Sequence, residues 1–128
     1  MSVDIKTVAM KLLSSTTVSF AAAAATTLYT VPAGFRCVLS HADVVAGADA
    51  GTSTVTIGRS TALTDFLGTQ TLSNLDAAYD KVTLQPIPNA TPVKQKSYAA
   101  AVVIQMDVTS AAGGATNTVY LFGYLYAV

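Results

Sequence analysis

The stretch from Thr118 to Val128, TVYLFGYLYAV, constrains the fold of this chain more than any other stretch. In a β-strand, successive side chains point to opposite faces of the sheet. One face of this stretch is then aromatic and consists of Tyr120, Phe122, Tyr124 and Tyr126. The other face is aliphatic and consists of Val119, Leu121, Leu125 and Ala127, with Gly123 between them. A strand with water on one side of its sheet needs only one apolar face. We therefore expect the aliphatic face in the core and a second covering over the aromatic face.

The aromatic face is large enough to require a partner. An aromatic side chain buries roughly 150–250 Å², so about 600–1,000 Å² is involved. A monomer rarely leaves an apolar patch of that size in water. We predict that this face belongs to a subunit interface, together with apolar residues of the N-terminal segment. The predicted interface residues are Tyr120, Phe122, Tyr124, Tyr126, Ile5, Val8 and Leu12.

The composition indicates an all-β protein whose surface carries few charges. Charged residues make up 11% of the chain, against about 25% in an average soluble domain. All 7 acidic residues are aspartate, although helix surfaces favour glutamate. Threonine and valine are abundant, and both favour strands. The chain is therefore either a monomer with an apolar surface or a subunit that buries much of its surface in an assembly.

Residues 1–15 are compatible with two structures. Their apolar residues follow a helical spacing, namely Ile5, Val8, Ala9, Leu12 and Leu13. Val8, Met10 and Leu12 also alternate with other residues, as in an extended segment. We expect either a short helix or an extended arm that docks on a neighbouring subunit, followed by a single β-sandwich domain over residues 16–128.

Residues 16–128 carry about eight strand signals, which are separated by turn signals and show no internal repeat. Long strands are expected at Phe35–Val45, with a bulge near Ser40–His41, and at Val93–Thr109. The second long strand is expected to form an antiparallel hairpin with the C-terminal strand. Residues Ala62–Leu67 are expected to form one helical turn, which Gly68 ends. The pattern favours an antiparallel β-sandwich with a jelly-roll-like topology.

The sequence contains no arrangement of residues that is typical of catalysis, a cofactor or a metal. His41 is the single histidine. Its neighbour Ser40 is expected to point to the other side of the strand, although Asp43 shares its face. Cys37 is the single cysteine and lies in an apolar run, where it is expected to be a small buried side chain. We therefore predict that the protein is not an enzyme and has no catalytic, cofactor-binding or metal site.

Neither nucleic acid nor a membrane is expected as a partner. The 7 basic and 7 acidic residues cancel, and no basic stripe is present that would neutralise phosphates. No run of about 18 apolar residues exists that would span a membrane. The first fifteen residues lack the apolar core of a signal peptide. We expect a protein that is made and used without secretion through the usual pathway.

The segment from Thr27 to Arg36, TLYTVPAGFR, resembles an opening that recurs in virion proteins of tailed bacteriophages. In those proteins a strand ends in Val-Pro-Ala-Gly and a long strand follows. The words LQPIP at Leu84–Pro88 and SYAA at Ser97–Ala100 are compatible with that class, as is the closing aromatic strand. The resemblance covers residues 16–128 in general style, and only the ten-residue opening is specific.

The resemblance implies a structural protein of the virion, most of all a head decoration (cement) protein on the capsid surface. Such a protein is a jelly-roll-like sandwich that assembles, often as a trimer, on the major capsid protein and stabilises the head. It has no catalytic residues to transfer. A phage tail, baseplate or fibre component is the alternative within the same class.

A different class of function is a carbohydrate-binding β-sandwich module. Tyrosines near turns would then stack on sugar rings, and Tyr29, Tyr79 and Tyr98 are the candidates. Such modules favour exposed tryptophan, and the chain has none. The sequence therefore favours the structural virion protein.

Overall fold

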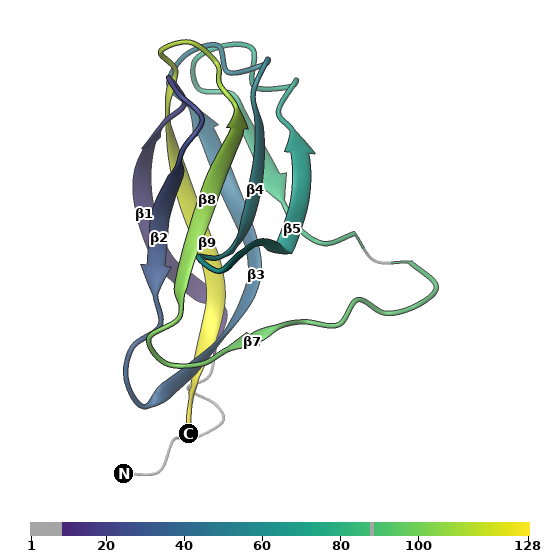
Figure 1. The fold of residues 1–128 in the computed structure, drawn as a ribbon. Coiled ribbons are helices and arrows are strands. Elements are labelled where there is room, and N and C mark those ends of the chain that lie inside the picture. The colour runs from purple at the N-terminus through teal and green to yellow at the C-terminus, as the bar shows by residue number, and fades with distance from the viewer. Residues whose placement is uncertain (1–8, 88) are drawn as a thin grey trace.

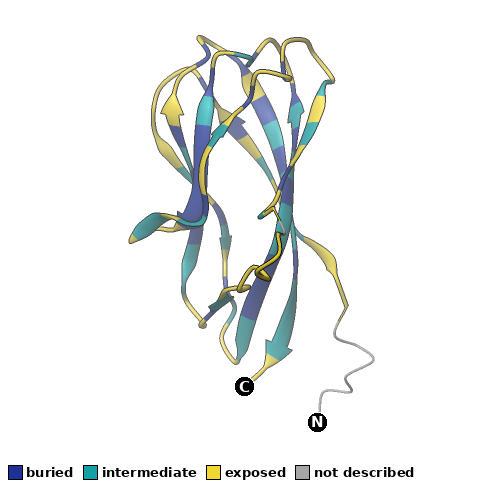
Figure 2. Cartoon of the chain, turned by 90° about the vertical axis from the view of Figure 1, so that its right-hand side faces the viewer, coloured by how far each residue is buried: buried dark blue, intermediate teal, exposed yellow. Residues whose placement is uncertain are grey.

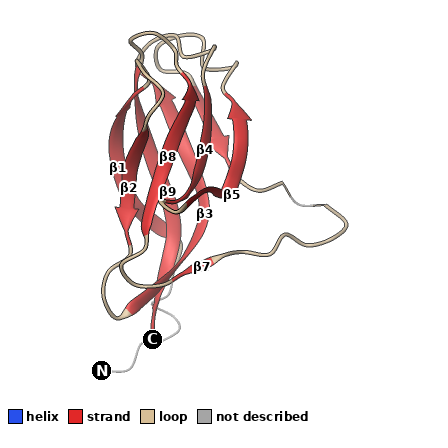
Figure 3. Cartoon of the chain, viewed as in Figure 1, coloured by secondary structure: helices blue, strands red, loops and turns tan. Residues whose placement is uncertain are grey.

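The computed structural model describes residues 9–87 and 89–128 of the chain. Within these residues the chain forms nine strands and no helix. Figures 1 and 3 show how the strands are arranged. The strands build two antiparallel sheets that pack face to face as a sandwich. The prediction of an all-β antiparallel sandwich is therefore confirmed.

Sheet A contains the C-terminal strand in its centre. Its strands are β1 (Lys11–Ser19), β3 (Phe35–Ala46), β6 (Lys81–Leu84), β7 (Ser97–Tyr98) and β9 (Thr116–Ala127). Their order is β1-β9-β3-β6, and the short β7 pairs with β3. Strand β9 pairs with β1 on one side and with β3 on the other. The stretch that dominates the sequence is therefore flanked by a strand on each side.

Sheet B covers the inner face of sheet A. Its strands are β2 (Ala25–Thr30), β4 (Thr54–Arg59), β5 (Ala62–Thr71) and β8 (Val103–Ser110). Their order is β2-β8-β4-β5. Apart from the two-residue β7, the strands divide equally between the sheets. The chain changes sheets between most successive strands and brings its first and last strands side by side, which is the jelly-roll arrangement.

The core lies between the sheets and is built mainly from aliphatic side chains of alternating positions. Figure 2 marks the buried residues along the strands in dark blue. On β9, Val119 and Leu121 are buried and Leu125 packs against them. Ile104, Met106 and Val108 of β8 face them from sheet B. The aliphatic face of the C-terminal strand is therefore the inner one, as expected from its smooth, branched side chains.

The bulge expected near Ser40–His41 is present. The register between β3 and β9 shifts between Leu39 and His41. Beside this bulge, a side chain at Gly123 would meet the backbone carbonyl oxygen of Val38. Glycine therefore allows the two central strands to approach each other closely.

The predicted hairpin between the second long strand and the C-terminal strand is wrong. Strand β8 lies in sheet B and β9 lies in sheet A. The connection between them contains a tight turn at Ala112–Ala115, but both ends of this turn hydrogen-bond to Phe20 in the β1–β2 connection and do not bring β8 and β9 together as a hairpin. The chain uses this connection to cross the thickness of the sandwich.

Two further local predictions are also wrong. Residues 93–109 do not form one strand, because the chain turns at Ala99–Val102, where Ala101 has a φ of 70°. The apolar residues of that turn are therefore not covered on two sides. Residues Ala62–Leu67 form part of β5 rather than a helical turn, because pairing with β4 overrides their local preference.

The N-terminal segment contributes to the sandwich earlier than expected. Strand β1 begins at Lys11, so residues 11–15 are an edge strand of sheet A and not a helix. The predicted boundary at residue 15 thus falls inside β1. Ile5 and Val8 of the predicted interface lie outside the described residues.

Candidate interaction surface on the outer face of sheet A

The aromatic side chains of β9 form a row along the middle of the outer face of sheet A. They alternate with the buried aliphatic residues of the same strand and therefore point away from the core. Tyr120 is nearest the end where β9 begins, and Tyr126 is nearest the C-terminus. We call the outward side chains of β9, namely Tyr120, Phe122, Tyr124 and Tyr126, the aromatic row.

The two neighbouring strands extend the apolar character of the row at its centre. Leu12 of β1 lies opposite Phe122, and its exposed fraction is 49%. On the other side His41 of β3 lies opposite Phe122. The two rings are stacked, with centroids 4.6 Å apart and an angle of 13° between their planes. Leu12, Phe122 and His41 thus form a continuous band across three strands.

Hydrogen bonds fix the end of the aromatic row that is nearer the C-terminus. The hydroxyl groups of Tyr126 and Ser97 are 2.8 Å apart. Arg36 donates to the Ser97 hydroxyl oxygen at 2.8 Å and to its carbonyl oxygen at 2.9 Å. Tyr124 packs beside Tyr126, with ring centroids 6.4 Å apart. The hydroxyl group of Tyr126 is therefore hydrogen-bonded, and its ring packs beside that of Tyr124.

A polar cluster borders the other end of the aromatic row, at Tyr120. Asp43 lies opposite Tyr120, accepts a hydrogen bond from Thr83 at 2.7 Å and pairs with Lys81 at 3.2 Å. Burial alone would raise the pKa of Asp43, but the hydrogen bonds from Thr83 and Lys81 outweigh it and lower the pKa. The carboxylate therefore stays charged in its place at the edge of the apolar band.

The aromatic row is less exposed than the sequence predicts. All four side chains are half-buried, because the flanking strands and neighbouring rings cover part of each. The estimate of about 600–1,000 Å² assumes fully exposed rings, so the area left for a partner is smaller. The exposed side chain of Leu12, which lies opposite Phe122, adds to it.

Ser40 and His41 lie closer together than the alternation of a regular strand predicts. At the bulge, the Ser40 hydroxyl and His41 Nδ1 are hydrogen-bonded at 2.9 Å. Asp43 does not complete a catalytic relay, because its carboxylate is engaged by Thr83 and Lys81. The described contacts thus give His41 a role in packing against Phe122.

Other titratable side chains are buried in the body of the sandwich. Burial raises the pKa of the Cys37 thiol to about 11, so it stays protonated at neutral pH. Burial and the neighbouring Asp65 raise the pKa of Tyr98, whose hydroxyl donates to Asp65 at 3.0 Å. Among the described residues, no group of three or more candidate ligands is placed to hold a metal ion. None of the described segments is a helix that is long and apolar enough to cross a membrane.

The three tyrosines considered for sugar stacking do not form a platform. Tyr98 is buried and hydrogen-bonded to Asp65. Tyr29 is half-buried on β2 of sheet B, whereas Tyr79 is exposed in the connection that leads to β6 of sheet A. These positions remove the geometric basis for a shared sugar site.

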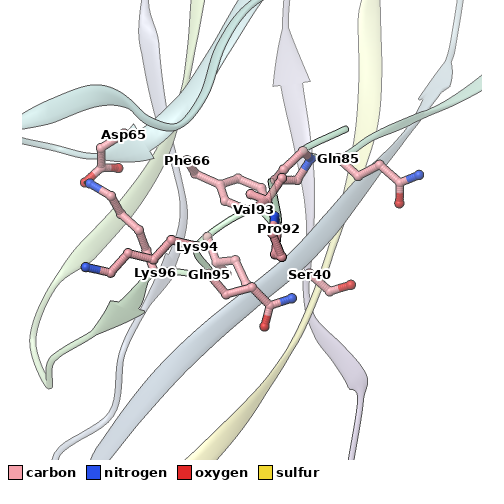
Figure 4. Close-up of a pocket in the computed structure, with 11 residues that line it drawn as sticks. Ser40, Asp65, Phe66, Gln85, Pro92, Val93, Lys94, Gln95 and Lys96 are labelled. Carbon is pink, nitrogen blue, oxygen red and sulfur yellow. The ribbon is translucent and has the colours of Figure 1, made fainter. Parts of the chain in front are cut away.

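A second feature, which the sequence does not predict, is a hollow of about 540 Å³ at the side of the sandwich. The hollow lies between β5 and the connection from β6 to β7, as Figure 4 shows. Phe66 and Asp65 of β5 line one wall, and Pro92–Lys96 line the other. The prolines of this connection predict a surface loop, but its packing against β5 depends on long-range contacts.

Two solved structures contain chains with a similar fold. A chain in the acidic stable capsid structure of Helicobacter pylori bacteriophage KHP30 matches with a TM-score of 0.60 and 16% identity, and the match covers 93% of this chain and 92% of that one. A chain in the capsid asymmetric unit of cyanophage Pam1 matches with a TM-score of 0.53 and 15% identity, over 92% of this chain and 84% of that one.

At these identities the similarity establishes a shared fold. No protein-family model matches the sequence, and no curated protein is similar to it in sequence. The two structural matches cover nearly the whole of this chain, so the shared fold is the complete sandwich and not one sheet of it.

Proposed function

We propose that the protein is a structural component of a bacteriophage virion, and that it decorates the capsid surface as a cement protein. The observation that carries this proposal is the match over 93% of the chain to a chain in a phage capsid structure. The second match also comes from a phage capsid. The resemblance of the segment Thr27–Arg36 to phage virion proteins supports the same conclusion independently of the fold.

The properties of the sandwich fit a mechanical role. Its described residues offer an apolar band on the outside of one sheet and no metal cluster. In this role the protein covers junctions between major capsid subunits and opposes the internal pressure of packaged DNA. The free energy that it supplies comes from buried surface area and not from chemistry.

We further propose that the protein assembles as a homo-oligomer, with a trimer as the expected state, through the aromatic row and Leu12. In support of this, Leu12, the one described residue of the N-terminal part of the predicted interface, lies opposite Phe122 of the aromatic row. Ile5 and Val8 precede β1 and extend the same apolar segment in sequence. They remain part of the proposed interface.

The direct test uses phage heads assembled without this protein. Purified full-length protein should bind these heads saturably and raise the temperature at which they release DNA. Isolated tails from the same phage are the matched control. Binding to tails alone would make the protein a tail, baseplate or fibre component. Absence of binding to either particle, with selective binding on a glycan array, would favour the carbohydrate-binding module.

The proposed docking arm is best tested by a deletion that stops before β1. Removing residues 1–15 would delete the first half of β1 and damage the sandwich. Removing residues 1–8 leaves β1 intact and tests the docking arm alone. We expect this variant to keep its circular dichroism spectrum and unfolding midpoint but to lose attachment or assembly. Unchanged attachment and assembly would show that the arm is dispensable.

A further inference from the structure

The balanced net charge of the chain conceals a separation of charge along the sandwich. The β2–β3 and β7–β8 connections lie at one end of the sandwich, which we call the loop end (Figure 1). The β4–β5 connection and the long β6–β7 connection lie in the half of the molecule nearer this end, and the β6–β7 connection projects to the side. Most basic residues lie in the half of the molecule nearer this end. They are Lys11, Arg36, Arg59, Lys94 and Lys96.

The opposite end is acidic. The connections that meet there contain Asp49, Asp76 and Asp80. Asp43 and Asp107 lie in the halves of their strands that are nearer to this acidic end. Lys81 is the one basic residue that the structure describes there. Among the described residues, Asp65 is the one acid in the basic half, and it already binds two of the basic side chains there.

The long connection from β6 to β7 adds exposed apolar side chains to the basic end. It spans residues 85–96 and is described except at residue 88. The exposed fractions of Ile87 and Val93 are 82% and 41%. The connection contains Lys94 and Lys96 but no acidic residue. Its prolines restrict the backbone, which reduces the entropy lost when such a segment binds a partner.

Contacts with the sandwich hold the C-terminal part of this connection in place. Asp65 pairs with Lys96 at 3.5 Å and with Arg59 at 2.8 Å. The next residues are fixed by Tyr98, which donates to Asp65, and by the bonds from Arg36 to Ser97. Lys94 forms no ion pair with a described residue. The charge of Lys94 is therefore available to a partner. The segment that carries it is held in place two residues further on, where Lys96 pairs with Asp65.

We propose that the loop end is the surface that docks on the capsid shell, and that its partner there is a protein surface with carboxylates around an apolar recess. This inference rests on the proposed function. Ile87 and Val93 would enter the recess, and Lys94 would meet the carboxylates at its rim. The acidic end would then point away from the shell. The aromatic row, on the side of the sandwich, stays available for contacts between copies.

The same observations favour a protein over nucleic acid as the partner. Phosphate recognition uses a stripe of available cations, but Arg59 and Lys96 are paired with Asp65 and Arg36 is bonded to Ser97. The large apolar side chain of Ile87 in this connection is 82% exposed. A recess in a protein accommodates such a side chain, whereas a phosphate backbone does not.

The test measures binding of four full-length variants to heads assembled without the protein. Ile87→Ser removes an exposed apolar side chain at the loop end, and Tyr79→Ser is its matched control at the acidic end. Lys94→Gln removes a cation at the loop end, and Lys81→Gln is its matched control at the acidic end. Each variant is compared with the wild type at low and at physiological salt.

We expect Ile87→Ser to weaken binding by at least about fivefold. Lys94→Gln should weaken it by up to about fivefold and should reduce its dependence on salt. Both controls should bind within about twofold of the wild type. An unchanged oligomer mass for every variant shows that the loss lies in docking and not in assembly.

Two outcomes would overturn the inference while the proposed function stands. In the first, wild-type protein binds heads and both loop-end variants bind as tightly as their controls. In the second, the loop-end variants lose self-association, which would place the acidic end of a second copy against the loop end. If wild-type protein does not bind heads at all, the proposed function fails and this inference fails with it.

Discussion

The outer faces of the two sheets differ sharply, although their inner faces share one core. On sheet A the outer face carries the aromatic row, with Leu12 on one side and His41 on the other. On sheet B the outward positions are mostly polar, among them Thr27, Gln105, Asp107 and Thr109. There Gln105 donates to the Thr27 hydroxyl at 3.2 Å, and the hydroxyls of Thr54 and Thr109 are 2.7 Å apart.

The difference separates what the fold requires from what a partner requires. Both sheets need one apolar face to close the sandwich, and both have one. Sheet B shows that a polar outer face is compatible with this architecture. The aromatic residues outside sheet A are therefore not needed to form the core, which is why we assign them to an interface.

The largest effect on stability should come from the inner face of sheet A. Leu121→Ala removes a side chain that is 0% exposed and should lower the free energy of unfolding by about 2–5 kcal/mol. Phe122→Ala, one residue along but on the outer face, should cost less because its ring is only half-buried. Denaturant unfolding of the two variants, at a protein concentration at which the oligomer is dissociated, measures both free energies. Equal costs would erase the distinction between the two faces.

The next effect concerns assembly. Tyr124→Asp places a charge in the proposed dry interface and should weaken the oligomer by about 100-fold or more. Thr27→Asp makes the same change on the outer face of sheet B and should leave the oligomer intact. Sedimentation velocity gives the masses, and circular dichroism checks that both variants fold. If Thr27→Asp dissociates the oligomer and Tyr124→Asp does not, sheet B forms the interface.

A smaller effect concerns alkaline pH and the buried thiol of Cys37. The folded pKa of about 11 exceeds the ordinary value of 9.0, so the unfolded chain loses this proton first. The free energy of unfolding should therefore fall as pH rises from 9.0 to about 11. Unfolding curves across that range should show a weaker decline for Cys37→Ala than for the wild type. An identical decline would place the thiol in water.

The smallest effect is expected on the outer face of sheet B. Thr109→Val removes a hydroxyl that bonds to Thr54 but is exposed to water. The free energy of unfolding should change by no more than about 1 kcal/mol, and the oligomer mass should not change. A change in mass would show that this polar face also contacts a neighbouring copy.

The sequence predicts the faces of the strands better than their partners. Alternation assigns Leu121 to the core and Phe122 to the outside, and the bulge at Ser40–His41 also follows from local pattern. The same alternation says nothing about which strand lies beside β9. The expected hairpin with β8 fails because Ala112 and Ala115 bond to Phe20, which is distant in sequence.

The candidate surfaces show the same limit. The aromatic residues of β9 are visible in the sequence, and so is Leu12. That Leu12 lies opposite Phe122 depends on the pairing of the first strand with the last. The charge separation is invisible in a chain with balanced charges, because it arises only when the jelly roll brings distant turns to one end. The anchoring of Lys96 by Asp65 depends on the same topology.

The central claim is that this sandwich decorates a phage head and uses the outside of sheet A to contact other copies. The most direct measurement is electron cryomicroscopy of heads with the protein bound. We expect jelly-roll density on the outside of the head, with Tyr124 and Phe122 turned toward neighbouring copies. Density confined to the tail would contradict it, and so would a bound sandwich whose aromatic row faces open solvent.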